Sequence, residues 1–328
     1  MLMASTASPR MMHDFGVSHH HTVIIDCPLS LDPLNLARGK PVVNYSPSLA
    51  TRFGIFPRDS PDQVKWYKSE SCCIFHTANT WSTKEDVNLL CCRMNSSSLV
   101  YAAGNLPLPK NQHAPEEETC QLYYYSFPFA ANEPNHVFPL SVIPFEFPEV
   151  SPLTRMEEAQ YVYGCTMRSG SFSVALGQAS KIDCLAKFDV ASLIAQGKAR
   201  HSTTAVDTRS VLQILEQTTE KSDIKIFTLP AKHYAQEPSF VPRQTQRGED
   251  DGFLLVYVFD EAQLVHGEAP AHAQSELWII DAWDMSTVCA KIRLPQRGSF
   301  SSPLHRCLQS EDMLADSTVW TAWRMVHC

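Results

Sequence analysis

Short runs of β-branched and aromatic residues recur from Gln63 onward, with proline, glycine and other turn-forming residues between them. Runs of this length and composition are typical of β-strands, and their regular recurrence indicates an all-β sandwich, barrel or propeller. HTVIID, before Gln63, also predicts a strand, and no sequence repeat chooses among the three architectures. The runs are QVKWYKS, CCIFHTAN, DVNLLCCRM, SLVYAA, CQLYYYSF, QYVYGCTM, CLAKFDV, KIFTLP, GFLLVYVF, ELWIIDAW and VCAKIRLP.

Two segments depart from the strand pattern. Asn105 to Glu118 is rich in proline, asparagine and glutamate, which indicates a solvent-exposed loop. Thr208 to Lys221 carries apolar residues at helical spacing and predicts one amphipathic helix on the outside of the sheets. No stretch has the length or the shift in composition of an interdomain linker, so we expect residues 1–328 to form a single domain.

Composition excludes some classes of function. A formal net charge of -8 without long runs of one sign argues against a nucleic-acid partner, which needs clustered lysine and arginine. The 11 cysteines include no CxxC pair, and the polar N-terminus is too short for a secretory leader, which favours a reduced, cytoplasmic setting. The longest apolar run, Phe253 to Phe259, is too short to cross a bilayer. The sequence is compatible with peripheral contact with a membrane.

Two histidines stand in apolar surroundings where they need an explanation. His76 ends the apolar run CCIF, and His13 lies within MMHDF. A lone buried histidine is more often a satisfied core residue than a ligand, but two in similar settings indicate a site. His19 to His21 are a weaker metal candidate, because consecutive residues of a strand point to alternate faces and cannot all converge on one ion.

The segments around these histidines, with several further blocks in the same order, resemble the carotenoid cleavage oxygenase family, also called the carotenoid/retinal pigment epithelium oxygenase family. The resemblance extends from about Met11 to about Pro295. The blocks are MMHDF (Met11 to Phe15), TRFGIFPR (Thr51 to Arg58), IFHTANTW (Ile74 to Trp81), FEFPEV (Phe145 to Val150), YVYG (Tyr161 to Gly164), EPSFVPR (Glu237 to Arg243), EDDGFLLVYVFD (Glu249 to Asp260) and SELWIIDAWD (Ser275 to Asp284).

The resemblance implies a seven-bladed β-propeller with an Fe(II) ion on its axis, held by histidines. His13 and His76 match two of the family's ligands, and His305 is the candidate for its C-terminal one. Glu146 and Glu237 match glutamates that hydrogen bond to ligand histidines, although a solvated strand-end charge is the alternative for both. His305 is displaced from the family pattern and followed by arginine instead of glycine, so an exposed tail residue is its alternative.

The implied reaction is oxidative cleavage of a conjugated C=C bond of a carotenoid or apocarotenoid to two carbonyl products, with O2 as co-substrate. A stilbene-type phenolic substrate is the alternative within the same chemistry. A non-catalytic propeller fragment that binds an apolar ligand or a partner is the alternative from another class. The family segment with the first histidine and the first blades has no counterpart here, and the C-terminus is altered, so we expect an incomplete propeller.

Overall fold

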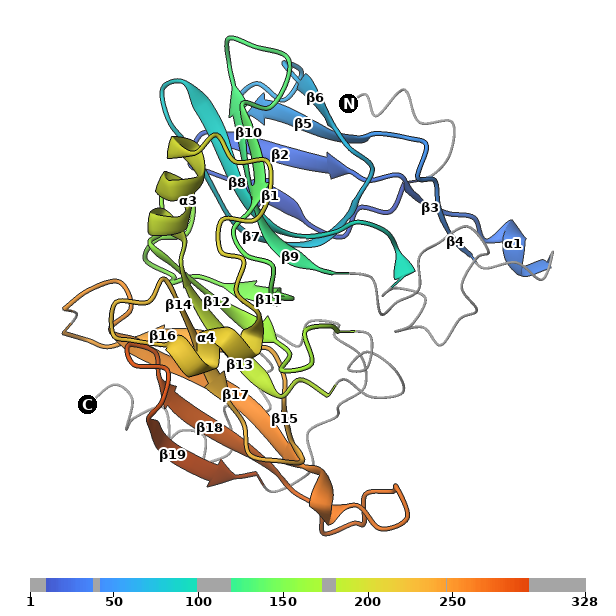
Figure 1. The fold of residues 1–328 in the computed structure, drawn as a ribbon. Coiled ribbons are helices and arrows are strands. Elements are labelled where there is room, and N and C mark those ends of the chain that lie inside the picture. Colours follow the sequence, from blue (N-terminus) through green and yellow to red (C-terminus); the bar gives the residue numbers. More distant parts are fainter. Residues whose placement is uncertain (1–9, 38–41, 99–118, 173–180, 246, 295–328) are drawn as a thin grey trace.

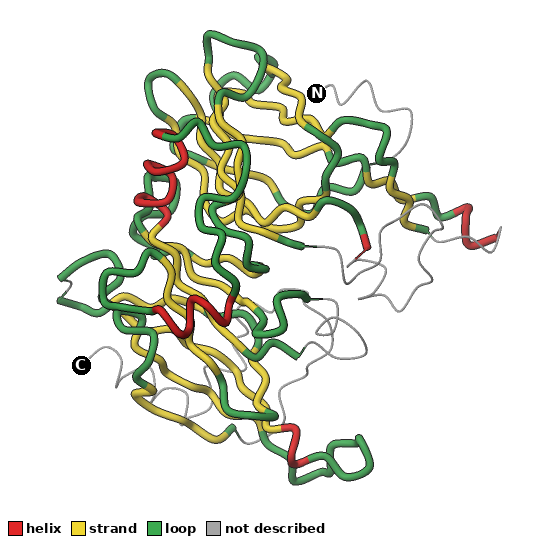
Figure 2. Tube along the Cα trace, viewed as in Figure 1, coloured by secondary structure: helices red, strands yellow, loops and turns green. Residues whose placement is uncertain are grey.

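The computed structural model describes residues 10–37, 42–98, 119–172, 181–245 and 247–294 of the 328-residue chain. Strands dominate these residues, and the helices are few and short (Figures 1 and 2). The all-β prediction is therefore confirmed. The predicted loop at Asn105 to Glu118 and most of the predicted strand SLVYAA lie outside the described residues.

The described strands form four antiparallel sheets of four or five strands and one two-stranded sheet. The first sheet has the order β1-β2-β5-β6 and contains β1 (Phe15–Val17), β2 (His21–Asp26), β5 (Thr51–Pro57) and β6 (Lys65–Ser69). The second has the order β10-β9-β8-β7 and contains β7 (Cys73–Ser82), β8 (Asp86–Met94), β9 (Gln121–Pro128) and β10 (His136–Pro139). The two-stranded sheet pairs β3 (Leu29–Leu31) with β4 (Val43–Tyr45).

The third and fourth sheets are also antiparallel and are also built from strands that are close in sequence. The third has the order β11-β12-β13-β14 and contains β11 (Glu146–Glu149), β12 (Tyr161–Thr166), β13 (Cys184–Asp189) and β14 (Ile224–Thr228). In the fourth, β15 and β16 both pair with β17, which is followed by β18 and β19: β15 (His233–Ala235), β16 (Ser239–Pro242), β17 (Gly252–Asp260), β18 (Ser275–Asp281) and β19 (Val288–Arg293).

The four sheets follow one another in an open arc, each built from strands that are consecutive or nearly so in the sequence (Figure 1). Neighbours in sequence can pair through short turns, so each sheet needs little besides its own segment. In the part of the chain that the structure describes, no strand pairing closes the arc into a ring. This is the arrangement expected of an incomplete propeller.

Large aromatic side chains fill the spaces between the sheets. Phe53 of the first sheet lies 4.9 Å and 5.0 Å, between ring centroids, from Tyr125 and Phe127 of the second. Tyr163 of the third sheet stacks on Phe240 of the fourth at 5.1 Å. Aromatic pairs in such offset or stacked geometry add about 0.5–1.5 kcal/mol each to the energy of burial. They give the arc a continuous apolar core.

The first three sheets each begin at an edge strand, namely β1, β7 and β11, and in the fourth sheet β16 pairs only with β17. These four strands are called here the inner edge strands. β7 packs against both β1 and β11, which belong to the sheets on either side of it. The approach of β1 to β7 is so close that a Cβ atom on Gly16 would lie 2.3 Å from Oγ1 of Thr80. Residues at the starts of these strands are thereby brought together.

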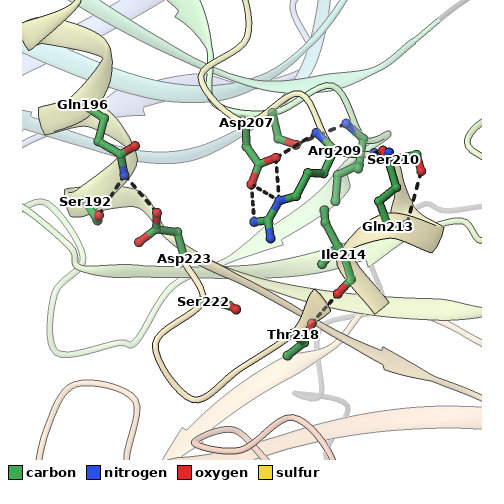
Figure 3. A network of polar contacts seen from close by, with 12 residues as sticks. Ser192, Gln196, Asp207, Arg209, Ser210, Gln213, Ile214, Thr218, Ser222 and Asp223 are labelled. Atoms are coloured by element: carbon green, nitrogen blue, oxygen red, sulfur yellow. Dashed lines mark hydrogen bonds and ion pairs between the residues drawn. The ribbon is translucent and has the colours of Figure 1, made fainter. Parts of the chain in front are cut away.

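The helices connect strands on the outside of the sheets. α1 (Leu34–Ala37), α3 (Val190–Ala199), α4 (Val211–Gln217) and the 3-10 helix η2 (Glu261–Gln263) are the helices described. α4 contacts β14, and its first turn has a capping box between Ser210 and Gln213 (Figure 3). From α3, the amide of Gln196 donates to Asp223 at 2.9 Å (Figure 3). No helix in the described ranges is both long enough and apolar enough to span a bilayer.

The helix predicted over Thr208 to Lys221 is confirmed in position but is shorter, because α4 begins after the Ser210 cap and ends at Gln217. α3 was not predicted. Its sequence continues the apolar character of the strand run CLAKFDV, so no boundary between strand and helix is visible in the sequence. The helix starts at Val190 because the Asp189 side chain accepts a hydrogen bond from the Ser192 amide. The short strands β11, β15 and β16 also escaped prediction, since three or four residues carry little periodicity.

Gly16→Ala should lower the free energy of unfolding by about 1–3 kcal/mol, because the added methyl group forces β1 away from Thr80 on β7. Chemical denaturation of the two proteins measures the difference. Gly248→Ala is the matched control, since its Cβ would come no closer than 3.3 Å to another atom, and its effect should stay within about 0.5 kcal/mol. Equal midpoints for Gly16→Ala and wild type would contradict the close β1–β7 packing.

Candidate metal centre

The motif residues lie on or beside the inner edge strands. His13 lies two residues before β1, His76 is within β7, Glu146 is the first residue of β11, and Glu237 lies two residues before β16. They come from four successive sheets and are spread through the sequence from residue 13 to residue 237. The inner side of the arc is therefore where a site shared by all the sheets can form.

His76 and Glu146 form the closest polar contact of this region. His76 Nδ1 lies 2.5 Å from Glu146 Oε2, and the two side chains are only 12% and 10% exposed. The same carboxylate oxygen accepts a hydrogen bond from the Phe147 amide at 2.6 Å, and Oε1 accepts one from the Cys120 thiol at 3.5 Å. Because Glu146 Oε2 is the acceptor of this contact, the neutral His76 ring carries its proton on Nδ1 and its lone pair on Nε2.

His13 is held in the same tautomer by a different partner. Its Nδ1 lies 2.9 Å from the carbonyl oxygen of Phe75, which can only accept, so Nδ1 carries the proton and Nε2 the lone pair. The ring is perpendicular to that of His76, with 5.2 Å between centroids and 88° between planes. Two neighbouring imidazoles thus each have an Nε2 suited to donate to a metal ion.

Irregularities in the backbone set the directions of these side chains. The pairing of β7 with β8 shifts register between Ile74 and Thr77, on either side of His76, and that of β11 shifts between Glu146 and Glu149. Phe147, next to Glu146, has φ of 55°, in a region that residues with side chains seldom adopt. Bulges of this kind are common beside functional sites because they turn a side chain out of the strand's alternation.

The electrostatic surroundings favour a cation. Burial lowers the pKa of His76, but Glu146, with smaller contributions from Asp14 and Glu237, outweighs it, and the net pKa of His76 is raised. A positive charge on or beside His76 is therefore stabilised by several carboxylates at once.

The other candidates from the sequence have different outcomes. His305 lies outside the described residues. Glu237 influences the pKa of His76, but the carboxylate that hydrogen bonds to His76 is Glu146. His19 pairs with exposed Glu157 at 3.3 Å, and His21 bonds to Ser82 at 2.9 Å, so neither serves the centre. Among the described residues, no set of three or more His, Cys, Asp or Glu side chains is placed to hold a metal ion.

Three polar residues close to the histidines in sequence were not singled out in the sequence analysis, although they lie inside the MMHDF and IFHTANTW blocks: Asp14, Thr77 and Asn79. Asp14 accepts hydrogen bonds from the amide and hydroxyl of Thr77. Buried Asn79 donates to the carbonyls of Thr154 and Glu157 and accepts from the Met156 amide, at 3.1, 2.7 and 3.0 Å. The only signal in the sequence was their place next to the histidines, because the partners are distant along the chain.

Comparison with known proteins identifies the family of this chain. The sequence profile of the RPE65 family, described as retinal pigment epithelial membrane protein, matches residues 2–302. The chain belongs to this family. The resemblance to carotenoid oxygenases inferred from the motif blocks is thus confirmed.

A carotenoid dioxygenase of Gibberella fujikuroi, carX, is 47% identical over 342 residues, an alignment that covers 88% of this chain and 49% of that protein. The chain spans about half the length of the curated relatives it matches.

Solved structures of the family have the same fold. A lignostilbene dioxygenase from Pseudomonas brassicacearum matches with a TM-score of 0.65 and 20% identity, over 89% of this chain and 54% of that one. The cobalt-substituted ACO of Synechocystis matches with a TM-score of 0.64 and 20% identity, over 90% and 52%. Likeness at this identity shows the fold alone: the sheets are part of a β-propeller of the carotenoid oxygenase type.

Asn79→Ala should release the turn at residues 154–157, since two carbonyls and one amide lose their buried partner at a cost of about 1–3 kcal/mol. Hydrogen exchange of the Met156 amide and tryptic cleavage after Arg155 should both become faster. Asn135→Ala is the control, because that side chain is exposed. Unchanged exchange at Met156 would show that Asn79 does not hold the turn.

Proposed function

We propose that this chain contributes to an Fe(II)-dependent oxygenase that cleaves a conjugated C=C bond of a carotenoid or apocarotenoid with O2, giving two carbonyl products. The observation that carries the proposal is the pair of perpendicular imidazoles, His13 and His76, each with its proton held on Nδ1 by a partner. The similarity to a protein named carotenoid dioxygenase, at 47% identity, supports this substrate class over a phenolic stilbene.

The residues fit the metal that the family implies. Neutral imidazole nitrogens suit Fe(II), and His13 and His76 would hold it through Nε2, with His305 as a third ligand from the C-terminal segment. The carboxylates of Glu146 and Asp14 near His76 offset the charge of a divalent cation. Glu237 would orient a further ligand from its position before β16.

The bound iron would supply the activation of O2 and of the polyene. This chain's own residues would fix the ligands and limit the access of water. Glu146 keeps the His76 proton on Nδ1, and the Phe75 carbonyl does the same for His13. The rings of Phe75 and Phe147 lie 5.0 Å from His13 and 5.3 Å from His76, between centroids, and present apolar surface to an apolar substrate.

A carotenoid dissolves in lipid and hardly in water, so its delivery calls for contact with a lipid phase. We therefore include peripheral membrane contact in the proposal, as the way in which the polyene reaches the protein. Incubation of the iron-loaded chain with an apocarotenoid or a stilbene, in air, tests the substrate class. Carbonyl fragments of the apocarotenoid support the proposal, fragments of the stilbene alone reassign the substrate, and no fragments from either favour a non-catalytic role.

His76→Ala should reduce bound Fe(II) to the level of a protein-free sample, because the ion loses a ligand and its place is taken by water. Anaerobic dialysis against Fe(II), followed by elemental analysis, measures this. His272→Ala is the matched control, since His272 is exposed in the loop before β18. Iron at the wild-type level in His76→Ala would refute the assignment of His76 as a ligand.

Glu237→Gln should weaken Fe(II) retention by about 10- to 100-fold, the usual effect of losing a carboxylate that orients a ligand. The fold should persist, because the substitution is nearly isosteric, and circular dichroism checks this. Glu133→Gln, at an exposed position, controls for the loss of one negative charge. Retention equal to that of the control would mark Glu237 as an ordinary surface charge.

A further inference from the structure

Asp14 connects the chain around His13 to the chain around His76. Its Oδ2 accepts hydrogen bonds from the Thr77 amide at 2.8 Å and the Thr77 hydroxyl at 2.7 Å, and its Oδ1 accepts one from the Phe15 amide at 2.7 Å. Asp14 follows His13 directly, and Thr77 follows His76 directly. One carboxylate therefore joins the residues next to both candidate ligands.

The Thr77 amide needs this acceptor because of its place in the sheet. β7 is an edge strand with β8 on one side only, so alternate amides point to the inner side of the arc, where no strand of its own sheet can accept them. The register shifts on both sides of Thr77 interrupt the ladder further. An ionised carboxylate is a stronger acceptor for such an amide than a neutral group.

A second contact between the same segments makes the connection rigid. His13 Nδ1 donates to the Phe75 carbonyl, so the segment 13–15 is bonded to β7 on both sides of His76. With bonds at residues 75 and 77, the backbone of His13 can neither slide along β7 nor rotate about a single contact. The two segments that are joined in this way carry the two perpendicular imidazoles.

We propose that Asp14 is a positioning residue, whose carboxylate holds His13 against β7 so that the two imidazoles keep the geometry needed to share one metal ion. The inference rests on the proposed function for the identity of the ion. The attachment of segment 13–15 to β7 through Asp14 is called here the clamp. It is a property of the metal-free chain and can be tested without iron. Asp14 acts through His13 and His76 and is not assigned a contact with the metal or the substrate.

The chain contains a matched control of the same local chemistry. Asp284 accepts hydrogen bonds from the Ser286 amide, the Thr287 amide and the Thr287 hydroxyl, at 2.8, 3.0 and 2.6 Å. This carboxylate lies in the turn between β18 and β19, on the fourth sheet, and joins no histidine segment. Asp284→Asn therefore weakens an equivalent set of interactions and should change stability without changing the histidines.

The test compares Asp14→Asn, Thr77→Val and Thr77→Ser with Asp284→Asn in the full 328-residue chain. Long-range ¹H–¹⁵N spectra of the metal-free proteins report which ring nitrogen of each histidine carries the proton. Competition with a chromophoric chelator under anaerobic conditions reports the affinity for Fe(II). Near-UV circular dichroism confirms that each variant is folded.

We expect Asp14→Asn to give His13 a mixture of tautomers and to weaken Fe(II) binding by about 10- to 100-fold. Thr77→Val, which loses one hydrogen bond and keeps the amide, should weaken Fe(II) binding by about 2- to 10-fold. Thr77→Ser should restore the wild-type values, since it returns the hydroxyl. Asp284→Asn should match wild type in both measurements.

Wild-type tautomer signals and Fe(II) affinity in Asp14→Asn would overturn the proposal, as would equal changes in Asp284→Asn. If Asp14→Asn does not fold, Thr77→Val and its rescue by serine decide the question. A wild-type chain that binds no Fe(II) would refute the iron site of the proposed function. The tautomer of His13 would still decide whether the clamp exists.

Discussion

The hydrogen bond between His76 and Glu146 is the interaction on which the candidate centre depends. It joins the inner edge strands of the second and third sheets, and both groups are almost fully buried. A buried carboxylate is costly unless its oxygens are satisfied, and Glu146 has the His76 ring, the Phe147 amide and the Cys120 thiol as donors. Loss of any of these would leave charge or polarity uncompensated in the core.

The same requirement explains why polar residues gather on the inner side of the arc. Edge strands present amides and carbonyls that no neighbouring strand of the same sheet can pair with. Here side chains pair with some of them: Asp14 with the Thr77 amide, His13 with the Phe75 carbonyl, and Glu146 with the Phe147 amide. The geometry that satisfies the backbone also orients the histidines. Structural and functional demands therefore fall on the same few residues.

Between the third and fourth sheets, burial is mainly apolar, but a buried ion pair also joins them. Lys187 of the third sheet lies 2.5 Å from Asp250, just before the fourth, and both side chains are less than a tenth exposed. Burial lowers the pKa of Lys187, and its amine is held by Asp250 and by the carbonyls of Ala282 and Trp283. Such a pair adds little net stability, but it disfavours any other alignment of the two sheets. The alignment matters because Glu237 belongs to the fourth sheet's segment.

The strand pattern of the sequence by itself determined the all-β class, because each sheet is built from consecutive segments whose β-propensity is readable locally, as in DVNLLCCRM and GFLLVYVF. The motif blocks determined the family and directed attention to His13, His76, Glu146 and Glu237. Only the tertiary structure decided that Glu146 is the partner of His76, that Asp14 joins Thr77, and that Asn79 holds the turn at Met156. These contacts connect residues more than 60 positions apart, and they arise from the packing of inner edge strands, which local periodicity does not encode.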